Sequence, residues 1–139
     1  MRVLVLVKAT EESERGAKCS TDVVEKMAKF NERLVDAGVM MACDGLHPSS
    51  KGKRVSFCGD KNRVTDGPFA ETKELLAGFW IWNVQSIDDA VEWLQQAPFG
   101  SGTETEIRPI LEAEDFGCHY GTKLGERDQP LVEQLAVHG

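Results

Sequence analysis

Two segments of the chain are apolar at consecutive positions, although they lie far apart in the sequence. Residues 3–7 are aliphatic throughout, and residues 75–84 add Phe79, Trp80 and Trp82 to a similar run. A strand that is apolar on both of its faces is typical of one that is covered on both sides. The pattern therefore predicts two central strands of a sheet.

Two shorter segments have strand character as well. Residues 39–43 (VMMAC) follow a glycine and are broken by Asp44-Gly45, and residues 105–111 form a last run. Pro109 lies inside that run and has no N–H to donate to a neighbouring strand, which favours a place at the sheet edge.

Two segments with apolar residues at helical spacing lie between these strands. One follows the strand at residues 3–7, and the other follows the strand at residues 75–84. The first helix carries its apolar residues at 4-3-4-3 intervals, with Asp22 and Glu25 as a capping pattern at its start and Gly38 at its end: Val23, Met27, Phe30, Leu34, Ala37. The second begins at Ser86 with Asp89 three residues on and ends before Pro98: Ile87, Val91, Leu94, Ala97. The polar residues 11–20 are expected to form a surface loop.

Between the two halves lies a segment of a different kind. Residues 55–58 and 63–65 are short β-prone runs on either side of Gly59-Asp60-Lys61-Asn62, which predicts a hairpin. The hairpin is closed by Asp66-Gly67-Pro68-Phe69-Ala70-Glu71-Thr72-Lys73-Glu74, where charged groups gather around a Gly-Pro corner. Here Pro68 is expected to begin a short helical turn capped by Asp66 or Gly67.

Without the hairpin, the order of elements is β-α-β followed by β-α-β. Right-handed crossovers then place both helices on one face of a four-stranded antiparallel sheet, which is the ferredoxin-like α+β arrangement. Two helices cover only one face, yet residues 3–7 and 75–84 are apolar on both. We therefore expect a homodimer whose facing sheets enclose a cavity for a small molecule.

Composition limits the classes of partner. The chain has 139 residues, a net charge of −7 and a pI near 5.0, so it lacks the clustered basic face that direct nucleic-acid binding needs. No apolar run approaches the ~20 residues that span a bilayer. The apolar run near the N-terminus is too short for a signal peptide, so a cytoplasmic location is expected.

The cysteines do not suggest a metal centre. Cys19, Cys43, Cys58 and Cys118 are widely spaced with no Cys-x-x-Cys, and reduced thiols are expected. A neighbouring His beside Cys43 or Cys118 is a weak signal without two further ligands. We predict neither a metal nor a cofactor.

Several candidate residues leave two interpretations open. His47 ends a strand before a proline and is either a surface loop residue or a catalytic partner. Trp80 and Trp82 share one strand face and either line an aromatic pocket or pack in the core or an interface. Glu106 and Arg108 share another face, so Arg108 pairs with Glu106 or with a ligand anion.

The quoted motif also resembles a known family. Asp66–Glu74 is similar to the YCII-related family in its DGPF-domain branch, and shorter matches support this: Gly38-Val39, Gly45-Leu46-His47-Pro48, Glu106-Ile107-Arg108-Pro109, Glu114-Asp115-Phe116. The resemblance covers about residues 1–116 and leaves 117–139 as an acidic C-terminal extension. It implies a dimeric α+β barrel. His47 stands where the branch is expected to have a polar amide.

The family resemblance leaves the activity open. Some relatives in the wider group are similar to enzymes that use a His and an Asp on small ring or lactone substrates, and DGPF domains occur beside sigma factors in bacterial genomes. One hypothesis is that Asp66 is a general acid or base on a small organic acid or ring substrate, with His47 assisting. Ligand-binding residues would then be Glu71, Lys73, Trp80 and Arg108. The alternative is a non-catalytic ligand-binding or regulatory module, in which Asp66 only fixes a turn.

Overall fold

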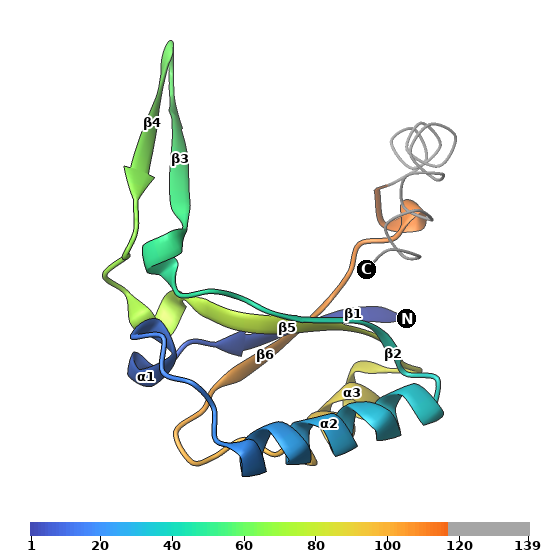
Figure 1. Cartoon of the computed structure of the whole chain (residues 1–139). Helices are drawn as coiled ribbons and strands as arrows, with labels where there is room; N and C mark the ends of the chain where they lie inside the picture. The colour runs from blue at the N-terminus through green and yellow to red at the C-terminus, as the bar shows by residue number, and fades with distance from the viewer. Residues whose placement is uncertain (117–139) are drawn as a thin grey trace.

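A four-stranded antiparallel sheet forms the centre of the molecule (Figure 1). The computed structural model describes residues 1–116. Its sheet has the strand order β2-β5-β1-β6 and is built from these strands: β1 (Arg2–Lys8), β2 (Met40–Gly45), β5 (Leu76–Asn83) and β6 (Thr105–Pro109). Two helices, α2 (Thr21–Asp36) and α3 (Ile87–Gln95), both lie on one side of the sheet. The predicted ferredoxin-like α+β fold is confirmed, with β1 and β5 central and β6 at an edge.

One face of the sheet and the two helices enclose the core. Val3 and Val5 of β1 are fully buried there, beside Trp80 and Trp82 of β5. From α2, Phe30 meets Trp80 edge to face at 5.9 Å between ring centroids. Burying ~200 Å² of a Trp side chain at ~25 cal/mol per Å² contributes about 5 kcal/mol as an upper value. The two tryptophans therefore supply much of what holds the helices to the sheet.

The helix starts are fixed by serine caps. Ser86 begins α3 as predicted, and its hydroxyl accepts from the backbone N–H of Asp89 at 3.1 Å. The predicted cap of α2 at Asp22 is wrong, because Ser20 is the extended residue whose hydroxyl accepts from the N–H of Val23 at 3.3 Å. At the other end of α2, Gly38 has a φ of 73°, which only glycine adopts without strain.

The predicted surface loop at residues 11–20 contains a short helix. In α1 (Glu11–Glu14), Thr10 and Ser13 form a reciprocal capping box across the first turn. The helix has no buried residue and no apolar stripe, so hydrophobic periodicity does not reveal it. The pair of hydroxyl caps is what stabilises this turn.

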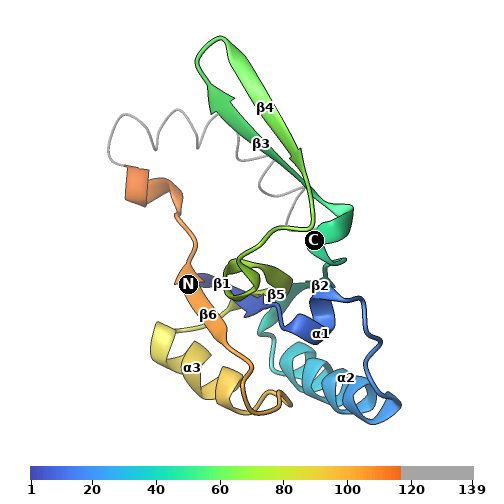
Figure 2. The ribbon, with the colours of Figure 1, turned by 90° about the vertical axis from the view of Figure 1, so that its left-hand side faces the viewer.

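The predicted hairpin is confirmed and projects from the body of the protein (Figures 1 and 2). Strands β3 (Lys53–Cys58) and β4 (Lys61–Asp66) pair only with each other, and every residue in them is exposed. A short 3₁₀ turn, η1 (Ser49–Lys51), leads into the hairpin, and η2 (Thr72–Glu74) leads from it into β5. The last described element is η3 (Ala113–Phe116).

Candidate functional site

The base of the hairpin is held by a compact set of polar contacts. The Ser49 backbone N–H donates to Glu14 Oε2 at 2.9 Å, and the Ser49 hydroxyl donates to Glu14 Oε1. The same hydroxyl accepts from the backbone N–H of Phe69 at 3.1 Å. This cluster, which we call the hairpin anchor (Glu14, Ser49, Gly67 and Phe69), ties α1, η1 and the Asp66–Glu74 segment together.

Gly67 has a steric reason to be glycine. A Cβ at this position would lie 1.7 Å from the backbone oxygen of Ser49, far inside van der Waals contact. The backbone N–H of Gly67 also donates to the carbonyl of Gly52 at 3.0 Å. The chain thus enters and leaves the hairpin in direct backbone contact, which fixes the direction of the hairpin.

Phe69 completes the anchor with its ring. The Arg54 guanidinium of β3 lies over this ring at 3.9 Å from the centroid. A cation over an aromatic face at this distance is stabilising by roughly 0.5–1 kcal/mol at an exposed site. Phe69 therefore packs the Asp66–Glu74 segment against the hairpin.

Asp66 lies at the last position of β4, where its carboxylate forms an ion pair with Lys53 of β3. Three quarters of its side chain is exposed, and the pair connects two residues that face each other across the hairpin. The expected helical turn at Pro68 is wrong, since the first helical residues after the hairpin are those of η2. The residues that accept or donate around Gly67 are Gly52 and Ser49, so the corner is stabilised from across the hairpin.

The other predicted site residues are spread over the chain. His47 follows β2 and is exposed, and the described residues show no hydrogen bond or ion pair between His47 and Asp66. Glu71 is exposed at the start of η2, and Lys73 lies within η2. Within one protomer, the structure does not bring His47 and Asp66 into contact.

Trp80 lies on the helix-covered face of the sheet. It is 3% exposed, and its indole N–H donates to Asn31 Oδ1 of α2 at 3.0 Å. Trp82 shares this face and is fully buried. Both tryptophans therefore belong to the core of the protomer and lie on the opposite side of the sheet from Phe79.

The opposite face of the sheet, which we call the open face, carries a second apolar stripe. Strand pairing places Leu6 beside Phe79 and Leu4 beside Ile81. These four side chains are partly exposed, and α2 and α3 lie on the other side of the sheet (Figure 1). The open face is thus an apolar surface on the two central strands.

Charged residues lie at the edge of the open face, on β6. Pairing with β1 sets Glu106 beside Leu6 and Arg108 beside Leu4, so both side chains share the open face. Lys8 Nζ lies 3.6 Å from Glu106 Oε1. Arg108 is exposed and has no ion-pair partner among the described residues.

Two pKa values are shifted near this sheet. A hydrogen-bonded ion pair with Glu112, with distances of 2.8 and 3.1 Å, raises the pKa of Arg2. Partial burial raises the pKa of the Cys43 thiol on edge strand β2, and the adjacent Asp44 carboxylate raises it further. Neither the Arg2 guanidinium nor the Cys43 thiol is buried in a cleft, so we assign a catalytic role to neither.

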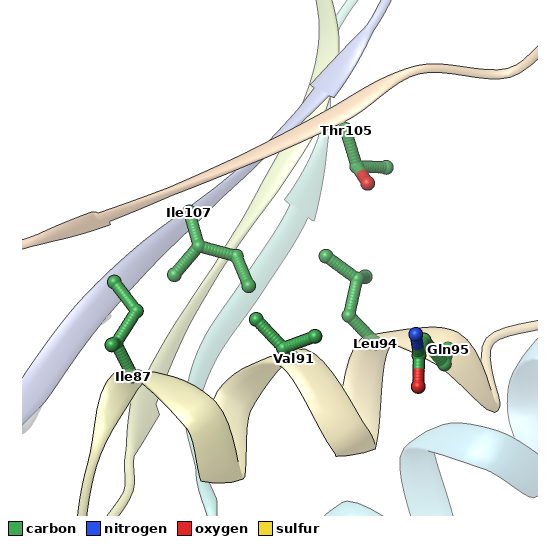
Figure 3. Close-up of a pocket in the computed structure, with 6 residues that line it drawn as sticks. All are labelled: Ile87, Val91, Leu94, Gln95, Thr105 and Ile107. Atoms are coloured by element: carbon green, nitrogen blue, oxygen red, sulfur yellow. The ribbon is translucent and has the colours of Figure 1, made fainter.

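A groove lies on the helix side of edge strand β6. It has a volume of about 470 Å³, and Figure 3 shows its lining between α3 and β6: Ile87, Val91, Leu94, Gln95, Thr105, Ile107. The lining contains no ionisable side chain. The groove is therefore a shallow apolar gap without groups for catalysis.

Glu14 and Ser49 are the residues at this site that sequence reasoning missed. Each lies in a polar stretch without periodicity, and they meet only through contacts between residues 35 apart. A carboxylate in one loop and a hydroxyl after a proline in another give no local signal of pairing. Among the described residues, no group of three or more His, Cys, Asp and Glu is placed to hold a metal ion.

The fold and the open face define a small α+β domain built on a ferredoxin-like sheet. The sequence profile of the YCII-related domain matches residues 1–114, and the chain belongs to that family. An uncharacterised protein of Rhizobium meliloti (strain 1021) is 31% identical over 91 residues, covering 63% of this chain and 73% of that protein. No helix in the described part of the chain is long and apolar enough to cross a membrane.

Proposed function

We propose that this protein is a homodimer that binds a small, largely apolar organic acid between the open faces of its two sheets. The observation that carries the proposal is the apolar stripe of Leu4, Leu6, Phe79 and Ile81 on the two central strands. Apolar surface of this kind is stabilised by removal from water. A second copy of the same face is the simplest cover, because a two-fold axis sets each stripe against its equivalent.

The rim residues favour an anionic ligand over a neutral one. Arg108 lies beside Leu4, so its guanidinium is near the apolar stripe and has no carboxylate partner among the described residues. Glu106, by contrast, is held near Lys8. A guanidinium binds a carboxylate through two parallel hydrogen bonds, which gives both affinity and orientation.

The geometry of the protomer supports binding more directly than acid–base chemistry. A carboxyl group that serves as an acid or base is set apart by apolar walls, whereas Asp66 is largely exposed and paired with Lys53. An acid–base role needs the partner protomer to enclose Asp66. The Asp66→Asn variant distinguishes ligand binding from acid–base catalysis. If the protein only binds its ligand, the affinity should change by less than about threefold. Loss of turnover in a folded variant would argue for catalysis.

The dimer is tested by placing a charge on the open face. Phe79→Asp would bury a carboxylate at the interface, and we expect the variant to sediment as a monomer at concentrations where the unmodified protein is a dimer. Val35→Asp is the matched control, because Val35 is 59% exposed on α2 and lies on the helix side. An unmodified protein that is monomeric at high micromolar concentration would refute the proposal.

The pocket is tested with anilinonaphthalene sulfonate, an aromatic anion that fluoresces in apolar surroundings. We expect the dimer to bind it and Arg108→Gln to weaken binding about tenfold, because the cation facing the sulfonate is lost. Lys29→Gln removes a cation from the exposed side of α2 and serves as the control. Equal affinity of all three proteins would place the probe elsewhere.

A further inference from the structure

The projecting hairpin Lys53–Asp66, which we call the arm, is exposed along both of its strands. All twelve residues of β3 and β4 are exposed, and neither strand pairs with the central sheet. An isolated two-stranded hairpin is marginal in water, so further contacts are needed to hold it firmly. Its base has them in the hairpin anchor and in the stacking of Arg54 on Phe69, while the strands β3 and β4 pair only with each other.

The two faces of the arm differ in character. Strand pairing puts Val55 beside Val64, with Phe57 on the same face at 82% exposure. The opposite face carries the cations of three pairs, Arg54 with Thr65, Ser56 with Arg63 and Cys58 with Lys61. Contact with an apolar surface would therefore stabilise one face of the arm, and contact with negative charge would stabilise the other.

The charge of the arm is opposite to that of the molecule. The arm (Lys53–Asp66) contains four basic and two acidic residues, a net charge of +2 in a chain of net charge −7. The rest of the chain therefore carries −9. A second copy of this protein is therefore an acidic partner for the basic arm. The arm can contact the acidic part of that copy without contacting the other basic arm.

The sheet topology locates the acidic surface that such an arm would meet. The arm precedes β5, and η3 follows β6; both strands are antiparallel to β1, so they run in the same direction. The arm thus leaves the sheet at the end where β5 begins, and η3 lies beyond the opposite end. Figure 1 shows both segments rising on the side of the sheet away from α2 and α3.

A two-fold axis between facing sheets exchanges these two ends in one of its orientations. We infer that the dimer takes this orientation and that the basic arm of each protomer contacts the acidic turn η3 of its partner. The turn η3 holds Glu114 and Asp115 and no basic residue, and Glu112 just before it is paired with Arg2. The inference rests on the proposed dimer and deepens it: the partner's arm bounds one end of the space between the sheets, so the pocket is incomplete in a single protomer.

Charge reversal across the proposed contact is the test. Arg63→Glu is expected to raise the dimer dissociation constant about tenfold at low salt, and Arg63→Glu combined with Glu114→Arg to restore it to within about threefold. Lys29→Glu changes the net charge equally on the exposed side of α2 and is the control. The effect of Arg63→Glu should shrink at high salt. Sedimentation equilibrium gives the constants.

A photocrosslinker on Cys58 provides a second, independent measurement. Cys58 is exposed at the end of β3, and the other cysteines are replaced by serine. Crosslinks from Cys58 to the partner's residues 109–116, identified by mass spectrometry of mixed isotope-labelled protomers, are expected. A dimer without these crosslinks, or one indifferent to Arg63→Glu, overturns the arm contact and leaves the proposed dimer intact. A monomeric unmodified protein refutes both.

Discussion

At the scale of single residues, the hairpin anchor shows what a sequence motif can conceal. The Gly67-Pro68 corner invites an explanation by local turn chemistry, and Asp66 has a side chain suited to capping it. In the structure Asp66 pairs with Lys53, and Gly67 is required by the Ser49 backbone, which comes from 18 residues earlier in the chain. The motif could be found from sequence, but the reason for its glycine depends on a non-local contact.

Replacing Gly67 by Ala should therefore be costly. A Cβ 1.7 Å from the Ser49 carbonyl oxygen forces two backbone segments apart, and we expect the free energy of unfolding to fall by about 2 kcal/mol. Gly45→Ala is the control, since nothing lies within 4 Å of its Cβ position. Urea denaturation of both variants measures the difference. Equal stability of the two variants would contradict the steric explanation.

Cys43 provides a prediction about pH. Partial burial and the Asp44 carboxylate raise the pKa of its thiol, and the thiolate is the form that reacts with iodoacetamide. A raised pKa lowers the thiolate fraction at a given pH, so the rate of alkylation should reach half its maximum at a higher pH than for the same cysteine in the protein unfolded by urea. A variant with Cys43 as its single cysteine makes the measurement specific.

The Asp44→Asn variant checks the second cause of this shift. Removing the carboxylate should move the alkylation profile of Cys43 toward lower pH, while the contribution of partial burial remains. A profile for Cys43 in the folded protein at or below that in the urea-unfolded protein would show that folding does not disfavour the thiolate. Intact-protein mass spectrometry after short exposures follows the reaction.

At the scale of elements, sequence patterns predicted those with a periodic apolar face and missed those without one. The strands, the hairpin, α2 and α3 were all anticipated, because burial imposes a period of two or of about 3.6 residues. The four-residue α1 has no such face and was expected to be a loop. The start of α2 was placed at Asp22 because Glu25 lies three residues further on. Ser20, Thr21 and Asp22 are all capping residue types, and the backbone conformation identifies Ser20 as the cap.

The assignment of the cap can be checked by two substitutions. Ser20→Ala removes the hydroxyl that accepts from Val23 N–H and should lower the free energy of unfolding by about 1 kcal/mol. Asp22→Ala removes an exposed ion pair with Lys26 and a charge near the helix N-terminus, for which we expect about 0.5 kcal/mol. Urea denaturation compares them. A larger loss for Asp22→Ala would restore Asp22 as the main cap.

At the scale of the whole molecule, the uncovered sheet face is the feature that sequence predicted and structure made specific. The central strands are apolar on both faces, and two helices cover only one of them. The pattern therefore indicated that the second face needs a cover of its own. The structure then shows which residues lie on each side: Trp80 and Trp82 lie in the core, while Phe79 and Ile81 lie on the open face. Parity alone could not make this choice, because both faces of the strand are equally apolar.

The division of the chain is a further prediction at this scale. The core residues, the hairpin anchor and the Arg2–Glu112 ion pair all lie within residues 1–116. A chain ending after Phe116 should therefore fold with a thermal midpoint within about 4 °C of the full chain, equivalent to less than about 1 kcal/mol. Circular dichroism at 222 nm follows both proteins.

A chain ending after Pro109 is the contrasting variant, because it loses Glu112 and leaves Arg2 without this partner. If ending the chain after Phe116 costs as much stability as ending it after Pro109, residues 117–139 belong to the domain and the predicted boundary is wrong.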